Sequence, residues 1–239
     1  MRILAIDIGG TKMKCMLTGD TERRFAPSGP SYTPHQFIGD VRRLVGSERV
    51  DAVTIGFPGA IRHGRPTKEP VNLGRGWVDF DYHGAFECPV KLLNDAAMQA
   101  VGSYDGGRML FLGLGTGLGT ALVDQHHVIP LEVAHLPYRK HTFERYVGAH
   151  GLHTAGKKAW RLKVAEVCEI FARTFLPDYI VIGGGNAKEL KEVPPNCRLG
   201  DNSLAFTGGF RVWEPAWASS VPTLSGNLRF EDARRSASA

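Results

Sequence analysis

The chain lacks a hydrophobic run long enough to cross a membrane. No apolar stretch among its 239 residues approaches the ~20 residues that a membrane-spanning helix needs. The first predicted strand begins within one or two residues of Met1, which leaves no room for a signal or transit peptide. We therefore expect a cytoplasmic protein with no membrane partner.

Cysteine is scarce and scattered. The four cysteines, Cys15, Cys88, Cys168 and Cys197, form no C-x-x-C pair. Such spacing is typical of reduced thiols, and it matches neither a zinc motif nor a disulfide framework. We expect no zinc site.

A strong excess of one charge is also missing. The 29 Lys and Arg residues against 24 Asp and Glu give a net charge of +5. This surplus suits anionic ligands, but it is too small and too dispersed to indicate a nucleic-acid partner. The densest basic segment, GKKAWRLK at 156–163, is predicted to open a long helix, where such a run is usually a solvated face. A hydrophobic content of 43% is enough for the core of one large domain or two small ones.

Glycine, in contrast, is concentrated at turns between apolar segments. The stretch FLGLGTGLGTALV at 111–123 holds four glycines in seven positions. A β-hairpin turn usually needs only two special residues, so four exceed the requirement. A loop whose backbone N–H groups surround an anion needs bare backbone of this kind. Taken alone, the stretch leaves both interpretations open.

A second glycine turn lies at the N-terminus. The segment RILAIDIGGTKMKCMLT predicts strands at 2–8 and 13–18, joined by a Gly-Gly turn. Asp7 ends the first strand, where a carboxylate can hold a hydrated Mg²⁺. Thr11 and Lys12 follow the turn and can hold a phosphate. The two glycine hairpins together indicate two phosphate-binding loops in one chain.

Strands and helices alternate through the rest of the chain. Buried strands are predicted at 51–59, 90–95 and 178–185, and helices near 35–46 and at 155–176. Residues 193–213 show a mixed pattern, and the residues after Pro215 are rich in Ser, Ala and Arg. The alternation predicts two similar α/β lobes with a cleft between them.

An ordered series of motifs resembles the ROK family of sugar kinases, in the actin/hexokinase/Hsp70 superfamily. The series is DIGGTK at 7–12, GFPG at 56–59, VNLGRGW at 71–77, LLNDA at 92–96, GLGTGLG at 113–119, E-x-x-H at 132–135 and IGGGNA at 182–187. The later segment LEVAHLPYRKHTFERYVGAHGL is similar to the polyphosphate glucokinase branch. The resemblance implies a two-lobed actin-like ATPase (ribonuclease H-like) α/β fold. Its lobes would be 1–96 and 97–214, and we expect 215–239 to be a disordered tail.

The resemblance also implies a phosphoryl donor, ATP or polyphosphate, and Mg²⁺ bound through water at Asp7. The implied donor residues are Asp7, Gly9, Gly10, Thr11 and Lys12 in the first phosphate loop, Gly115, Thr116 and Gly117 in the second, and Gly183, Gly184 and Gly185 in a turn against the adenosine. The basic segments PYRK and GKKAWRLK would extend the site for a longer polyanion.

The sugar site is implied in the same way. Its residues would be Asn72, Asn94, Asp95, Glu132, His135 and Glu144. Asp95 matches the general base that takes the proton from the 6-hydroxyl of glucose. From the residues alone, Asp95 also fits the N-cap of a following helix, and both roles can coexist. Glu132, His135 and Glu144 also fit an ordinary surface turn and helix.

Two departures from the family pattern stand out. Only eight residues, none of them cysteine, separate His135 from Glu144, where many ROK proteins carry a zinc loop. Ala134 stands where the family usually has glycine, which bears on sugar selectivity. Three other functions stay open: a sugar-responsive regulator, a catalytically silent sugar-binding protein, and a kinase for another hexose or an N-acetylhexosamine. The resemblance further implies a homodimer.

Overall fold

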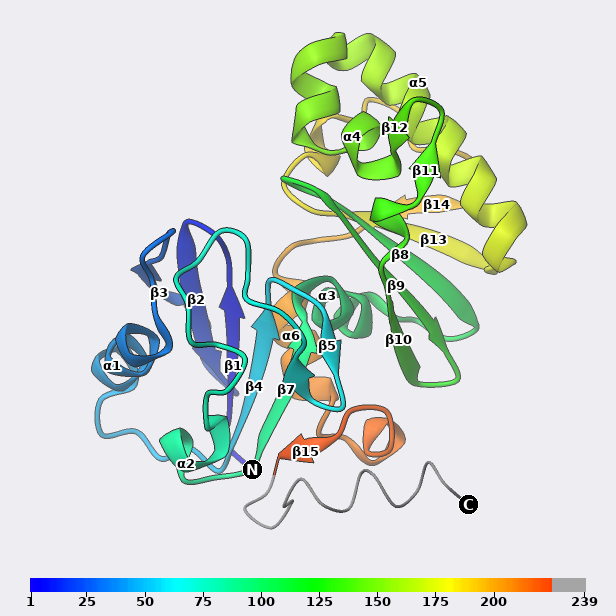
Figure 1. Cartoon of the computed structure of the whole chain (residues 1–239). Helices are drawn as coiled ribbons and strands as arrows, with labels where there is room; N and C mark the ends of the chain where they lie inside the picture. The colour runs from blue at the N-terminus through cyan, green and yellow to red at the C-terminus, as the bar shows by residue number, and fades with distance from the viewer. Residues whose placement is uncertain (225–239) are drawn as a thin grey trace, which may run out of the picture.

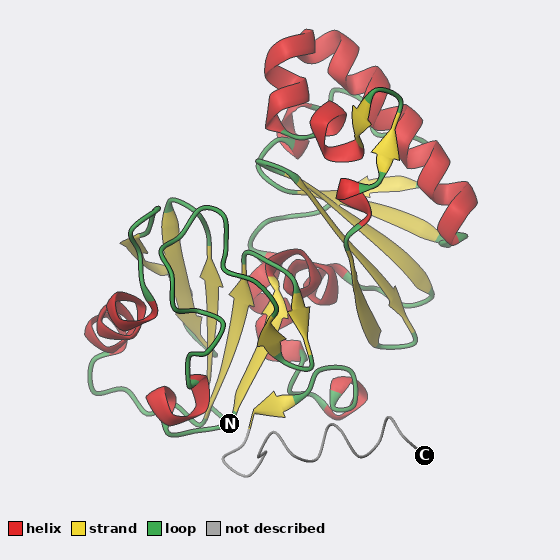
Figure 2. Ribbon diagram, viewed as in Figure 1, coloured by secondary structure: helices red, strands yellow, loops and turns green. Residues whose placement is uncertain are grey.

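The computed structural model describes residues 1–224, which form two β-sheets with helices on their faces (Figures 1 and 2). The first sheet has the strand order β15-β7-β4-β1-β2-β3, and the second has the order β10-β9-β8-β13-β14. The strands of the first sheet are β1 Ile3–Ile8, β2 Lys12–Leu17, β3 Arg24–Pro27, β4 Ala52–Phe57, β7 Val90–Asn94 and β15 Thr223–Leu224. Those of the second are β8 Arg108–Leu114, β9 Leu118–Asp124, β10 His127–Leu131, β13 Tyr179–Gly183 and β14 Cys197–Leu199.

The helices and small hairpins complete the two lobes. The helices are α1 Pro34–Val45, α2 Tyr82–Phe86, α3 Asp95–Ser103, α4 Phe143–Val147, α5 Ala149–Phe175 and α6 Leu204–Arg211. Short 3₁₀ helices are η1 Val133–His135, η2 Ala187–Glu189 and η3 Pro215–Trp217. The hairpins are β5 Ile61–Arg62 with β6 Arg65–Pro66, and β11 Pro137–Tyr138 with β12 His141–Thr142. None of the helices in the described residues is both long and apolar enough to cross a membrane.

Each glycine hairpin joins two antiparallel strands, as predicted. In the first sheet β1 pairs antiparallel with β2 and parallel with β4, and in the second β8 pairs antiparallel with β9 and parallel with β13. Alternation sorts the side chains of β2: Met13, Cys15 and Leu17 are buried in the core on the α1 side, while Lys12 and Lys14 lie on the other face. The face of the sheet that carries Lys14 and its partner Asp7 is the one on which α6 packs, since a Cβ added to Gly209 would lie 2.7 Å from the Cβ of Ala5.

The helices α3 and α6 pack backbone to backbone between the two sheets (Figure 1). A Cβ atom added to Gly208 would lie 1.8 Å from the carbonyl oxygen of Met98, and one added to Gly102 would lie 1.8 Å from that of Leu204. Buried hydrogen bonds then tie α6 to the first sheet, because Thr54 Oγ1 donates to the Gly209 carbonyl over 2.6 Å. Only glycine permits this approach.

One expectation needs correction. We expected a disordered tail from residue 215, but residues 215–224 form η3 and β15, and β15 pairs antiparallel with β7. The prediction rested on the Ser, Ala and Arg content of the segment and overlooked three apolar side chains. Trp217, Val221 and Leu224 are all buried. Residues 225–239, the rest of the expected tail, lie outside the described residues. The helix predicted at 155–176 is present as the second part of α5, and Gly156, whose φ of 72° is not helical, joins it to a first part that begins at Ala149.

The division into lobes 1–96 and 97–214 stays a proposal. The C-terminal part of the chain returns to the first sheet, since α6 packs against β1 and β4 and β15 extends the sheet.

The helix contact gives a stability prediction. Gly208→Ala should lower the free energy of unfolding by about 3 kcal/mol or more, because a methyl group has no space beside the Met98 carbonyl. Gly39→Ala is the matched control: Gly39 lies on the exposed side of α1 with no atom within 4 Å of an added Cβ, so this variant should gain about 0.5–1 kcal/mol. Denaturant unfolding measures both. Wild-type stability in Gly208→Ala would show that the close approach is not needed.

Candidate active site

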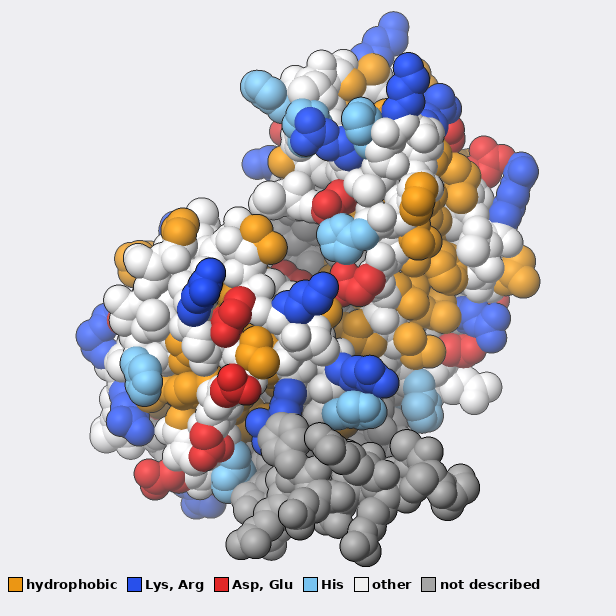
Figure 3. All heavy atoms as spheres, viewed as in Figure 1, with side chains coloured by type: hydrophobic (Ala, Val, Ile, Leu, Met, Phe, Trp, Pro, Cys, Tyr) orange, Lys and Arg blue, Asp and Glu red, His pale blue; other side chains and the backbone are white. Residues whose placement is uncertain are grey.

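The carboxyl ends of the parallel strands β1, β4 and β7 meet at one edge of the first sheet. Register places Asp7 beside Gly56, and Gly56 beside Leu93, so Asp7, the 56–59 turn and Asn94 lie at the same edge. Ligands of open α/β sheets bind at this kind of edge. Figure 3 shows the surface hollowed between the two lobes, with acidic and histidine side chains gathered on its upper wall.

Asn94, not Asp95, is the N-cap of α3. Its Oδ1 accepts hydrogen bonds from the backbone N–H groups of Ala96 and Ala97, over 3.0 and 3.2 Å. Its Nδ2 donates to the Gly59 carbonyl over 3.1 Å, which ties the GFPG turn to the helix. The cap interpretation that the sequence left open for Asp95 therefore belongs to its neighbour. One N–H of the Asn94 amide remains for another acceptor.

Asp95 is the first residue of α3 and is only partly exposed. Its Oδ1 accepts a hydrogen bond from the Ala96 N–H over 2.8 Å. Burial raises the pKa of its carboxyl to about 7, and the negative charges of Asp7 and, less strongly, Glu132 add to the effect. A carboxylate with a pKa near neutrality is suited to accept and release a proton.

Asp7 and Lys14 form an ion pair beside Asp95. Lys14 Nζ lies 3.5 Å from Asp7 Oδ2, and the two residues stand directly opposite each other in the hairpin. Burial raises the pKa of Asp7, while the ammonium group of Lys14 lowers it. Sequence reasoning missed Lys14. The signal was present, because a tight Gly-Gly turn between β1 and β2 brings these two positions together.

The first glycine loop is closely packed. Gly9 donates its N–H to the Lys12 carbonyl over 3.0 Å, and a Cβ on Gly10 would lie 3.0 Å from the Cβ of Asn72. Asn72 is thereby placed against the first loop. Thr11 is exposed, and the ammonium group of Lys12 lies 5.1 Å from the centre of the Phe25 ring.

The second glycine loop is held by two backbone regions far apart in sequence. The Ala149 N–H at the start of α5 donates to the carbonyls of Gly115 and Thr116, over 3.0 and 3.2 Å. Asn186 Nδ2 donates to the Gly115 carbonyl over 2.8 Å. A Cβ on Gly119 would lie 2.7 Å from the Cβ of Ala96, directly after Asp95. The glycines therefore bring this loop against the N-terminus of α3.

The third glycine turn packs against the second loop. Gly184 has φ 84°, and an added Cβ would lie 2.4 Å from the Leu114 carbonyl oxygen. Its N–H donates to Asn202 Oδ1 over 3.1 Å. Gly183 and Gly185 flank it at the end of β13. The asparagines Asn186 and Asn202, which position both glycine segments, were missed by sequence reasoning, although Asn186 lies within the IGGGNA motif.

Glu132, His135 and Glu144 come together on the second lobe. His135 Nε2 lies 3.7 Å from Glu132 Oε2, and His135 Nδ1 lies 3.4 Å from Glu144 Oε1. A Cβ on Gly117 would meet Glu144 Oε2 at 2.7 Å, so this acidic group borders the second glycine loop. The Ala134 side chain is buried in the core of the lobe, so its extra methyl group does not add to the surface of the site.

Some side chains of the basic segments that were expected to extend the donor site form ion pairs within the second lobe. Lys157 Nζ lies 2.5 Å from Glu189 Oε2, and Arg139 pairs with Glu166 over 2.6 Å. The four cysteines are free thiols. Within residues 1–224 no three His, Cys, Asp or Glu side chains are grouped so that they could hold a metal ion.

Comparison with known proteins places these features in a family. The ROK family model matches residues 3–130. The N-acetylmannosamine kinases of Escherichia coli and Shigella flexneri are each 34% identical over 139 residues, covering 52% of this chain and 47% of theirs. The chain thus spans about half the length of these curated relatives.

Several solved structures share the fold of this protein over most of the chain. The inorganic polyphosphate/ATP-glucomannokinase of Arthrobacter sp. strain KM superposes with a TM-score of 0.72 at 25% identity, covering 87% of this chain and 96% of that one. A ROK family glucokinase from Streptomyces griseus, solved with glucose and AMPPNP, gives a TM-score of 0.66 at 15% identity, covering 87% and 98%. The fold is the actin-like ATPase fold that the motifs predicted.

The burial of Asp95 and the charges around it predict a raised pKa that a titration can measure. A ¹³C NMR titration of aspartate carboxyls, assigned with Asp95→Asn, should show Asp95 titrating near pH 7. Asp7→Asn should move the midpoint to lower pH, because it removes the neighbouring negative charge, and Glu132→Gln should move it less. A midpoint near the ordinary value of about 4, or no response to Asp7→Asn, would contradict the geometry.

Proposed function

Because the chain belongs to the ROK family, we propose that it is a sugar kinase that transfers a phosphoryl group to the 6-hydroxyl of glucose. The observation that supports this most is the position of Asp95. Its carboxyl, with a pKa of about 7, stands at the start of α3 beside Asp7 and next to the second glycine loop. A sugar hydroxyl would reach this carboxylate, and the phosphoryl donor would lie beside that hydroxyl at the second glycine loop.

In the proposed reaction, Asp95 acts as general base. It takes the proton of the 6-hydroxyl while that oxygen attacks the terminal phosphorus, and the bond from phosphorus to the bridging oxygen breaks. Most of the acceleration in phosphoryl transfer comes from positioning and from neutralising charge. The glycine loops at 9–12 and 115–117 would supply close backbone contact to the donor phosphates.

A divalent cation fits the donor site. Asp7 offers a carboxylate beside Asp95, and Mg²⁺ binds through one or two carboxylates, waters and phosphate oxygens. Asp7 would hold the ion, in part through water, and the ion would neutralise charge on the donor phosphates. Lys14 would offset the repulsion between these anionic groups.

The sugar would lie between Asp95 and the second lobe. Glu132 and Glu144 can accept hydrogen bonds from sugar hydroxyls, and His135 can donate or accept. The remaining N–H of Asn94 and the side chain of Asn72 would complete the site from the first lobe. Gly183, Gly184 and Gly185 would lie against the adenosine of ATP.

N-acetylmannosamine is the second candidate substrate. The 34% identity to N-acetylmannosamine kinases favours it, whereas the structural similarity to a polyphosphate/ATP-glucomannokinase favours an unmodified hexose and either donor. Glucose remains the first choice because that neighbour is 25% identical and covers 87% of this chain, whereas the match to the N-acetylmannosamine kinases covers 52% of it.

The partners follow from the same proposal. The chain would work in the cytoplasm, where ATP and sugar phosphates are made, and without zinc.

We propose a homodimer, supported by exposed apolar side chains on the second lobe such as Ile129, Leu136 and Leu162. Figure 3 shows apolar side chains gathered along one side of that lobe.

The proposal is tested by assaying glucose, mannose and N-acetylmannosamine with ATP and with polyphosphate, in the presence of Mg²⁺. We expect glucose 6-phosphate to form fastest. Failure to phosphorylate any sugar with either donor would contradict the proposed function. Phosphorylation of N-acetylmannosamine alone would favour the second candidate.

Variants at Asp95 test its role. Asp95→Asn should lower kcat roughly 100-fold or more with a smaller change in sugar affinity, because a base acts in the transition state. Asp105→Asn, an exposed carboxylate just after α3, is the matched control and should be unchanged. In the wild type, kcat/KM should fall as the pH drops below about 7, since the base is then protonated. Near-normal turnover in Asp95→Asn would remove it from the mechanism.

A further inference from the structure

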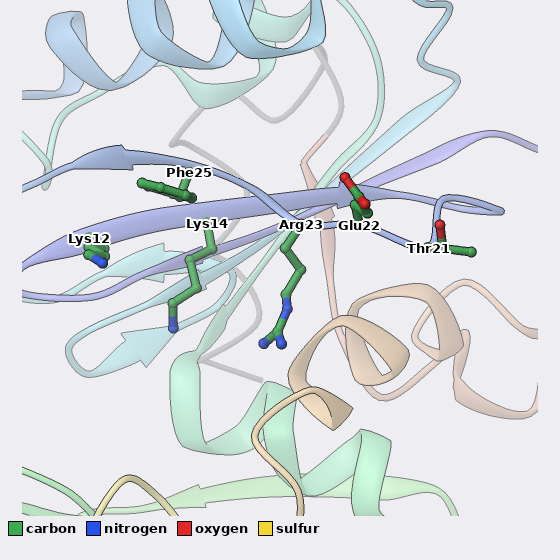
Figure 4. A pocket seen from close by; sticks show the side chains of 6 residues that line it. All are labelled: Lys12, Lys14, Thr21, Glu22, Arg23 and Phe25. Carbon is green, nitrogen blue, oxygen red and sulfur yellow. The ribbon is translucent and has the colours of Figure 1, made fainter.

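A groove of about 450 Å³ opens on the face of the β2–β3 hairpin that carries Lys14. It is lined by Lys12, Lys14, Thr21, Glu22, Arg23 and Phe25. Three of these six residues are cationic and one is acidic, so the lining has a net positive charge. Figure 4 shows Lys14 and Arg23 extending to the same side of the hairpin.

Two of the three cations are available to a ligand, although the Lys12 ammonium group also lies over the Phe25 ring. In the part of the chain that the structure describes, neither Lys12 nor Arg23 forms an ion pair, and both are exposed. Their neighbour Arg24 differs: it pairs with Asp20 and Glu48 and donates to the Leu44 carbonyl. Unpaired cations that share one groove favour an anionic ligand.

The groove borders the reaction centre through Lys14, which stands between Lys12 and Arg23 along the hairpin. Lys14 reaches Asp7 over 3.5 Å, and the charge of Asp7 acts on Asp95. An anion that contacts Lys14 would therefore be next to the donor site of the proposed kinase.

The end of the groove at Arg23 lies near the 201–203 segment. The pKa of Asp201 is lowered, mainly by hydrogen bonds from Ser203 and to a smaller extent by the charge of Arg23, so Arg23 lies near the 201–203 segment. In that segment Asn202 accepts the N–H of Gly184. The groove thus continues from Lys14 to Arg23, beside the segment that holds the third glycine turn.

We propose that Lys12, Lys14 and Arg23 form the binding groove for the trailing phosphates of a linear inorganic polyphosphate donor. The proposal rests on the proposed kinase function. A phosphoanhydride chain with its terminal phosphate at the first glycine loop, beside Lys12, would continue past Lys14 to Arg23. ATP has too few phosphates to need the far end of the groove, so Arg23 would discriminate between the donors.

The test compares Lys12→Gln and Arg23→Gln with the wild type, using polyphosphate and ATP as donors for glucose phosphorylation. Arg23→Gln should raise the KM for polyphosphate roughly five- to tenfold and leave the KM for ATP unchanged, since a charge-assisted contact is lost for one donor only. The double variant should also show a weaker dependence of polyphosphate binding on salt. Lys158→Gln removes an exposed and unpaired lysine on α5, in a segment expected from the sequence to extend the donor site, and it should change neither donor.

Direct binding of polyphosphate, measured by calorimetry without sugar, separates this proposal from the kinase function. If the wild type phosphorylates no sugar, the proposed function fails, and a loss of polyphosphate binding in Arg23→Gln would still support the groove. If the wild type uses ATP but Lys12→Gln and Arg23→Gln bind polyphosphate like the wild type, the groove is wrong and the kinase stands. A selective effect of Lys158→Gln would move the donor site to α5 and overturn the proposal. Thermal unfolding of each variant checks that it folds.

Discussion

The backbone contact between α3 and α6 determines where the candidate site lies. Gly102 and Gly208 allow the two helices to approach until an added Cβ would stand 1.8 Å from a carbonyl oxygen. This pair of helices lies between the two sheets, and α3 begins with Asp95. Because the packing fixes the position of α3 between the sheets, the first residue of this helix lies where the two lobes meet. The candidate base therefore faces the first-sheet edge with Asp7 and the glycine loop of the second sheet.

Close approach also explains the density of glycine in the three loops. Each of these segments has a position where a side chain would meet a neighbour: Asn72 for Gly10, Glu144 for Gly117, and the Leu114 backbone for Gly184. Two asparagine side chains then hold these glycine segments in place. Asn186 donates a hydrogen bond to the second loop, and Asn202 accepts one from the third turn. The site thus combines backbone segments held by polar side chains with acidic groups from both lobes, among them Asp7, Asp95 and Glu144.

Much of this could be predicted from the sequence, because glycine turns between apolar strands are local signals. The hairpins at Gly9 and Gly115 were found in this way. Long-range features were not: α6 contains two glycines in LAFTGGFR, which local propensity disfavours in a helix, and only packing against α3 explains them. The N-cap was placed one residue late, since Asn94 and Asp95 are both good caps. The roles of the sugar residues remain predictions, because no local pattern shows which hydroxyl each would contact.

The central claim is that Asp95 faces the reacting hydroxyl of a sugar held between the two lobes. A crystal structure of the protein with glucose and a non-hydrolysable ATP analogue tests it most directly. The account predicts the glucose 6-hydroxyl oxygen about 2.6–3.2 Å from an Asp95 carboxylate oxygen, with the terminal phosphate between the first and second glycine loops. Glucose bound with its 6-hydroxyl out of reach of Asp95 would contradict it.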